Sequence, residues 1–384
     1  MLSIYCFFTW VHKKTMFEFW LIFILIGVLI LVHEVGHFYV ARKLGVRVEE
    51  FSIGFGKKVF SRMRRGVRYS VRMLPFGGFV KLYGEHGGGE DDPESYSAQP
   101  AWKRFLILSA GVAMNIVAGW VFFSAAAAIG LPTPVSDGAT GVPVSIIEVS
   151  PHSPAADAGL RFGDIIESLE IGGVRVMIAT EQELIDAIGQ HKEEEVFLHI
   201  LRGSEQLTLR AIPRQNPPAG EGALGVSLAR LQIQRASLLW APIEGGLTLW
   251  RTTAATMAGL KLIASELVFR RRAPEGVSGP VGIFFFAHDI ARLGFSYLLQ
   301  FAGVISVNLA VMNFLPIPLL DGGWVFLLFV EKLRGGVRLG RRAENAALAL
   351  GFAVLGTLMI AVTYQDILRN GHRLVVGLRS MVPF

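Results

Sequence analysis

The chain has 384 residues, of which 52% are hydrophobic and only 18% are charged. Soluble domains carry about 25% charged residues, so this composition excludes an ordinary soluble globular protein and indicates a membrane protein. The formal net charge is +6, and in so apolar a chain the basic residues are expected to mark cytoplasmic loops rather than a nucleic-acid site.

Four apolar stretches are long enough to cross a bilayer as helices, which takes about 20 residues. We expect membrane helices over residues 17–42, 103–131, 295–330 and 346–368. No small-residue cleavage site follows the first stretch, so it predicts a retained span rather than a secretory signal peptide. Basic residues cluster in segments 43–102 and 331–345, and the positive-inside rule places both on the cytoplasmic side. The long segment between spans two and three is then outside, as is the tail, 369–384.

The cytoplasmic-side segment 43–102 begins with alternating apolar and polar runs. Residues 51–56 and 68–73 are typical of paired strands around a basic turn at 64–66, which predicts a β-hairpin beside the membrane. Residues 85–95 have the composition of a solvated loop. His86 lies among acidic residues there, in a pattern typical of a surface loop rather than a metal site.

The outer segment predicts a small α/β module over residues 140–213. Strands are expected at 142–149, 164–169, 195–201 and 206–212, and helices at 153–159 and 181–190. The next segment, 214–294, begins with a linker rich in proline and glycine. Its apolar-periodic stretch, 238–269, predicts an amphipathic helix that lies on the membrane surface, with a fifth span as the alternative.

The sharpest chemical motif is His33-Glu34-Val35-Gly36-His37, near the end of the first span. Positions i and i+4 lie on one face of a helix, so both imidazoles can bind one metal ion while Glu34 projects beside them toward a bound water. This is the arrangement of zinc hydrolases. A surface cluster at the water interface is the alternative, but ionisable groups in a membrane span are costly and are by default functional.

Two histidines leave a zinc ion one protein ligand short. Residues 313–323 supply a candidate, because two prolines and a glycine pair interrupt the third span there. Broken backbone at membrane depth is tolerated only where it lines a protein-buried or wet cavity, so we expect Asp321 to lie in a cavity. Its alternative role is to cap the following helix.

Two motifs together carry a family resemblance: the run from His33 to His37, and Asn313-x-x-Pro-x-Pro-x-Leu-Asp321-Gly-Gly. They resemble those of the site-2 protease family of intramembrane zinc metalloproteases, and specifically the bacterial regulator-of-sigma-E protease type. Residues 51–56 and 74–81 resemble the family's membrane-associated β-hairpin, residues 278–283 its motif before span three, and residues 142–213 its PDZ domain. In span two, Val112 stands where the family often has proline.

The resemblance implies a polytopic α-helical membrane protein with four transmembrane helices, a membrane-associated β-hairpin and one inserted α/β PDZ domain. It implies that His33, His37 and Asp321 bind Zn²⁺, that Glu34 is the general base, and that Asn313 donates to the developing oxyanion. The implied activity is that of a zinc metalloendopeptidase. The resemblance also implies a multi-pass protein of the bacterial inner membrane with its PDZ domain outside the cytoplasm. Its substrates would be single-span membrane proteins cut in regulated intramembrane proteolysis, including anti-sigma factors and signal-peptide remnants.

Substrate capture and alternative functions follow from the same residues. A hairpin edge would bind an unwound substrate by strand addition, or would only brace the first span. The PDZ domain would bind a peptide ligand or filter substrates by size.

An inactive protein that binds membrane segments or exported tails is the main alternative function, but the four residues of the zinc site are all present. A zinc transporter would need ionisable residues on several spans, whereas span two offers only Asn115.

Overall fold

A computed structural model describes residues 2–85, 87–135, 142–151, 153–218, 220–266, 279, 282–283, 286–287, 290, 294–337 and 340–381. The chain forms two compact units. Unit 1 comprises residues 1–125, 242–284 and 299–384, and unit 2 comprises residues 126–241 and 285–298. His86 and half of the expected motif at 278–283, namely residues 278, 280 and 281, lie outside the described residues.

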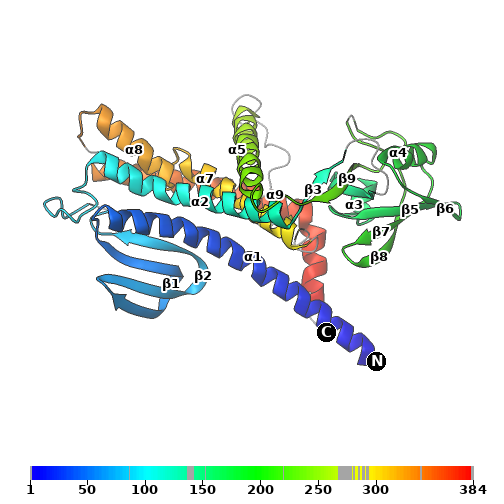
Figure 1. Cartoon of the computed structure of the whole chain (residues 1–384), viewed down its shortest axis with the longest axis horizontal. Coiled ribbons are helices and arrows are strands. Elements are labelled where there is room, and N and C mark those ends of the chain that lie inside the picture. Colours follow the sequence, from blue (N-terminus) through cyan, green and yellow to red (C-terminus); the bar gives the residue numbers. More distant parts are fainter. Residues whose placement is uncertain are drawn as a thin grey trace. The chain divides into compact units, whose positions relative to one another are not determined.

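Four helices are long and apolar enough to cross a membrane, as the sequence predicted. They are Phe23–Lys43 within α1 (Leu2–Lys43), α2 (Ala101–Ile129), α7 (Phe295–Phe314), and Arg342–Leu368 within α9 (Arg341–Met381). Protein covers between 6% and 39% of the most apolar window of each helix. The remaining apolar surface is the kind that lipid covers. In unit 1, α1 and α2 lie side by side (Figure 1).

The third membrane helix ends earlier than the expected range of 295–330. Helix α7 ends at Phe314, residues 315–320 form a non-helical connection, and α8 (Asp321–Leu333) follows. Pro316 and Pro318 lie in this connection, because proline lacks an N–H and clashes with the preceding turn inside a helix. Asp321 is therefore the first residue of a new helix rather than a residue in the middle of a span.

The segment after α1 forms two long strands, β1 (Val48–Arg64) and β2 (Val67–Leu82). Both strands bend, so they pair in more than one register: residues 58–64 pair with 67–72 across a tight turn, and residues 48–53 lie beside 78–82. The apolar side of this sheet packs against α1 and α2 in a buried cluster of Ala41, Val46, Val48, Val67, Leu82, Tyr96 and Ile107. The sheet is thereby fixed to the helix that carries the histidine motif.

A buried charge network stabilises the bent sheet. Glu50 is 6% exposed, accepts hydrogen bonds from Ser70 (2.6 Å) and Arg72 (2.8 Å), and pairs with Lys58 (3.3 Å). Burial opposes the charge of Glu50, but these donors outweigh it and lower the pKa of its carboxyl to about 2. Arg72 also donates to the carbonyl of Gly56 (2.8 Å), so one guanidinium ties together both bent segments.

Unit 2 contains the α/β module. Its sheet has the order β3-β9-β4-β5-β7-β8, with β6 beside β5. The strands are β3 (Leu131–Pro134), β4 (Val144–Val149), β5 (Ile165–Ile171), β6 (Val174–Met177), β7 (Val196–Arg202), β8 (Glu205–Ala211) and β9 (Val226–Gln234), and the helices are α3 (Pro154–Asp157) and α4 (Glu181–Gln190). Strand β9 pairs with β4, so the module extends past the expected end at residue 213. The proline- and glycine-rich run before β9 resembled a linker but is a loop within the module.

The core of unit 2 combines apolar packing with one buried ion pair. Fully buried residues from the strands and α4 form the core, among them Ile146, Leu169, Leu184 and Leu198. Asp164 is 0% exposed and accepts two hydrogen bonds from the guanidinium of Arg202, at 2.7 and 2.8 Å. The ion pair therefore joins the residue before β5 to the last residue of β7.

Helix α5 (Ala241–Ser265) occupies the stretch for which an amphipathic helix was expected. It is not among the four candidate spans in the described part of the chain. Leu249 and Leu260 pack against a cluster on α2 and α7, and Thr256 donates to Asn308 of α7 at 2.8 Å. One face of α5 therefore packs against two membrane helices, a contact that the expected helix on the membrane surface did not include.

Candidate metal centre

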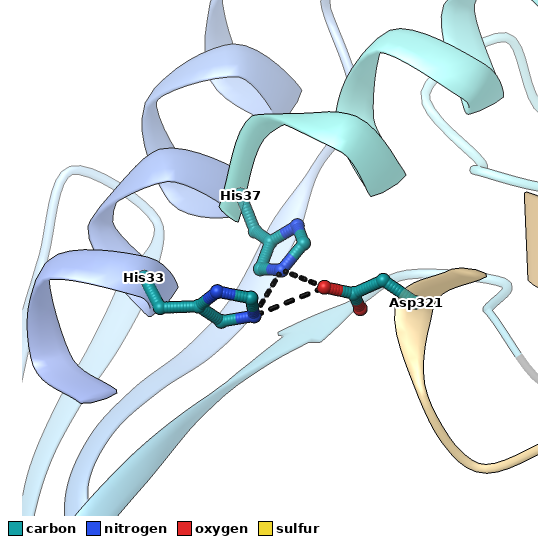
Figure 2. A group of neighbouring side chains, drawn as sticks. All are labelled: His33, His37 and Asp321. Carbon is teal, nitrogen blue, oxygen red and sulfur yellow. Dashed lines mark hydrogen bonds and ion pairs between the residues drawn. The ribbon is translucent and has the colours of Figure 1, made fainter. Parts of the chain in front are cut away.

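The structure brings together His33, His37 and Asp321. The two histidines lie one turn apart on α1, and Asp321 begins α8. Their Nε2 atoms are 3.1 Å apart, and Oδ2 of Asp321 lies 3.0 Å from Nε2 of His33 and 3.3 Å from Nε2 of His37 (Figure 2). Three potential ligand atoms from two elements distant in sequence therefore converge on one point.

The donor set fits a zinc ion. Two imidazole nitrogens and one carboxylate oxygen are the ligands of many catalytic zinc sites, which leave a fourth position to water. Oδ2 of Asp321 is buried with the two imidazole nitrogens beside it, and a cation bound by all three atoms would satisfy this oxygen. The cap of α8 is Leu320, without a side-chain cap hydrogen bond, so the alternative role of Asp321 as the N-cap is wrong.

His37 is oriented for metal binding by the backbone of α2. Its Nδ1 lies 2.8 Å from the carbonyl oxygen of Ile107, which can only accept a hydrogen bond. A proton therefore sits on Nδ1, and Nε2 faces Asp321. Donation of the second ring N–H to a carbonyl or carboxylate is the usual support of a metal-binding histidine.

Two glycines allow α2 to approach the histidine motif closely. A Cβ atom at Gly36 would lie 2.8 Å from the carbonyl carbon of Ala110. A Cβ at Gly111 would lie 2.6 Å from Cε1 and 2.7 Å from Nε2 of His33. Gly111 thus leaves the space in which the imidazoles meet Asp321. The sequence showed an Ala110-Gly111 pair in span two, but not that it faces the motif.

The other two predicted site residues lie differently. Oε2 of Glu34 accepts a hydrogen bond from the backbone N–H of Val80 at 3.0 Å, so the C-terminal end of β2, residues 78–82, contacts this carboxylate. Asn313 lies on the last turn of α7 and is partly exposed. In the described part of the chain no hydrogen bond joins Asn313 to His33, His37 or Asp321.

Comparison with known proteins agrees with this geometry. Residues 21–358 match the model of peptidase family M50. The chain belongs to that family. A Clostridium perfringens protein named as a zinc metalloprotease is 35% identical over 342 residues, which are 88% of this chain and 95% of that protein. The chloroplastic membrane metalloprotease of Arabidopsis thaliana is 31% identical over 351 residues, 88% of this chain and 76% of that protein. The regulator of sigma-W protease of Bacillus subtilis is 27% identical over an alignment of 429 positions, gaps included, that covers 90% of this chain and 97% of that protein.

Family membership confirms the resemblance of the two motifs to the site-2 protease family. The protein is a zinc metalloprotease of the site-2 protease family and a multi-pass membrane protein. The prediction of an enzyme is thereby confirmed, as is that of a zinc cofactor.

Proposed function

We propose that the protein cleaves the membrane segments of single-span membrane proteins, and that His33, His37 and Asp321 hold its zinc ion. The convergence of these three ligand atoms at the end of a membrane helix carries the proposal. A Bacillus subtilis relative is named a regulator of sigma-W protease, which supports a role in regulated intramembrane proteolysis. Anti-sigma factors and signal-peptide remnants are the substrates we propose.

The chemistry divides between the zinc ion and three protein groups. When bound, zinc lowers the pKa of a coordinated water to about 7 and so supplies a nucleophile at neutral pH. Glu34 would accept a proton from the attacking water and pass it to the leaving nitrogen of the scissile amide. Asn313 donates a hydrogen bond to the carbonyl oxygen that gains negative charge. Asp321 stays ionised as a ligand.

The C-terminal end of β2, residues 78–82, is suited to present the substrate. A transmembrane helix bonds its own backbone groups, so its amides are hidden until a part of it unwinds. Residues 78–82 pair with β1 on one side, and the N–H of Val80 points away from β1 to Glu34. We infer that an unwound substrate adds as a strand at this edge. It would replace Glu34 as the partner of Val80 and so lie beside the catalytic base.

Unit 2 has features that support a PDZ-type module. Residues 226–230 of β9 pair with β4 along one edge, and in the described part of the chain β3 pairs with residues 231–234 along the other. Glu181, at the start of α4, bonds both the backbone and the side chain of Arg230. A strand edge that the described residues leave partly unpaired beside a helix suits an extended peptide, so we propose that unit 2 binds an exported tail or filters substrates by size.

We propose that the protein lies in the bacterial inner membrane with unit 2 outside the cytoplasm. The basic residues of segments 43–102 and 331–345 support this orientation, because such residues are retained on the cytoplasmic side. A cysteine introduced at the exposed Lys192, with Cys6 replaced by serine, tests it. An impermeant reagent should label intact cells. Labelling only after lysis would invert the orientation.

Cleavage of a single-span reporter by the full-length protein in detergent tests the activity. The wild-type protein should cut the reporter within its membrane segment, and a zinc chelator should abolish cutting. Glu34→Gln, which removes the base and retains its shape, should also abolish cutting. Glu90→Gln, in an exposed loop, is the matched control and should cut like the wild type. Cutting that persists in Glu34→Gln would contradict the proposed mechanism.

A further inference from the structure

Asn115 is a fully buried residue of α2 for which the proposed reaction has no role. Its exposed fraction is 0%, and its Nδ2 lies 3.3 Å from Nδ1 of His33. Its backbone carbonyl accepts a hydrogen bond from Ser306 of α7 at 2.8 Å. Its side-chain oxygen, Oδ1, is buried without a hydrogen-bond partner. A buried polar group is costly when it is unpaired, so this amide requires an explanation.

The proposed ligand role of His33 supplies one. His33 presents Nε2 to Asp321 and His37, so its proton must sit on Nδ1 when Nε2 binds a metal ion. An Nδ1–H group needs an acceptor, and Nδ2 of Asn115 is a donor. The two ends of an amide have nearly the same shape. With the ends exchanged, Oδ1 faces the ring N–H, which removes the donor–donor contact and pairs the orphaned oxygen.

We propose that Asn115 is a positioning residue of the metal centre, whose Oδ1 accepts a hydrogen bond from Nδ1–H of His33. The bond fixes the tautomer and the ring orientation that direct Nε2 to the ion. His37 has the same support from the backbone carbonyl of Ile107, also on α2. Helix α2 therefore orients both histidines without contributing a ligand. This inference rests on the proposed ligand set.

Zinc affinity of the full-length protein in detergent, measured by competition with a chromophoric chelator, tests the inference. Asn115→Leu keeps the bulk and removes the acceptor, so it should weaken zinc binding 10- to 100-fold, which is about the usual effect of removing such a partner. Asn115→Asp keeps an oxygen acceptor and should remain within about threefold of the wild type. Asn308→Leu is the matched control, since this asparagine of α7 bonds Thr256 instead, and it should bind zinc normally.

The outcomes separate this inference from the ligand set on which it rests. His33→Ala should lose zinc; a His33→Ala variant that binds like the wild type would refute the ligand set itself. If His33→Ala loses zinc and Asn115→Leu does not, the positioning role alone is wrong. An Asn115→Asp variant as weak as Asn115→Leu would refute the acceptor role, because aspartate keeps both the shape of asparagine and an oxygen acceptor. Asn115→Ala removes the same acceptor and takes the place of Asn115→Leu if that variant does not fold.

Discussion

Substituting Gly111 by alanine should remove zinc binding although no ligand residue is replaced. The new Cβ would lie 2.6 Å from Cε1 and 2.7 Å from Nε2 of His33. Non-bonded carbon atoms prefer separations of about 3.5–4.0 Å, so the ring must shift by about 0.8 Å or more. Metal–ligand distances tolerate about 0.2 Å. We therefore expect at least a 100-fold loss of zinc affinity, about 3 kcal/mol.

The same substitution should not damage the helix. Alanine is favoured over glycine in a helix interior by about 1 kcal/mol, which offsets part of the roughly 1–3 kcal/mol that crowding of the histidine rings costs, so the metal-free variant should be destabilised by no more than about 2 kcal/mol. Stability and zinc affinity are thus expected to change independently, which a generally misfolded variant would not show. Competition with a chromophoric chelator gives the affinity, and thermal unfolding of the metal-free protein gives the stability.

Gly356→Ala is the matched control for this experiment. Gly356 lies in the α9 membrane helix, and a Cβ there meets nothing within 4 Å. This control should bind zinc like the wild-type protein. Gly111→Ala with wild-type zinc affinity would refute the close approach of α2 to the histidines. An equal loss of affinity in both variants would refute the steric argument.

Three further predictions concern other parts of the chain. Because the pKa of Glu50 is lowered from 4.5 to about 2 in the fold, its contribution of up to about 3 kcal/mol to the free energy of unfolding is present above pH 4.5 and lost as the pH falls toward 2. Glu50→Gln should make the stability of the β1–β2 sheet less dependent on pH in this range, as measured by the rate of proteolysis of the sheet at acid pH. Asp164→Asn should destabilise unit 2 by up to about 3 kcal/mol, because the partly buried charge of Arg202 loses its carboxylate partner, and hydrogen exchange of β5 and β7 should accelerate. Asp321→Ala should lower zinc content as much as His33→Ala does; unchanged content would remove Asp321 from the ligand set.

The parts of the site that depend on local periodicity were predictable from the sequence. His33 and His37 share a helix face because they are four residues apart. The helix break before Asp321 follows from the chemistry of two prolines. A helix after the break was considered only with Asp321 as its cap; that the helix starts at Asp321 itself could not be foreseen, because the apolar run continues through both helices to residue 330.

Contacts between distant segments explain the parts that were missed. The bond from Val80 to Glu34 requires the bent β2 to lie against α1, and no local pattern encodes that bend. The inclusion of β9 in the unit 2 sheet depends on its pairing with β4 across a loop that resembled a linker. Asn115 was noticed only as the polar residue of span two, because its importance comes from the histidine that packs against it.

The spacing of three residues on α2 explains how one helix serves both histidines. Ile107, Gly111 and Asn115 are four residues apart and therefore lie along one face of α2. The pairs run in opposite directions, since His37 meets Ile107 and His33 meets Asn115. One residue of rotation turns a side chain by about 100°, so an asparagine moved to position 116 would face away from His33. In an Asn115→Leu background, an asparagine at position 116 should therefore leave zinc affinity low, whereas restored affinity would show that the exact position of the polar group on α2 is unimportant.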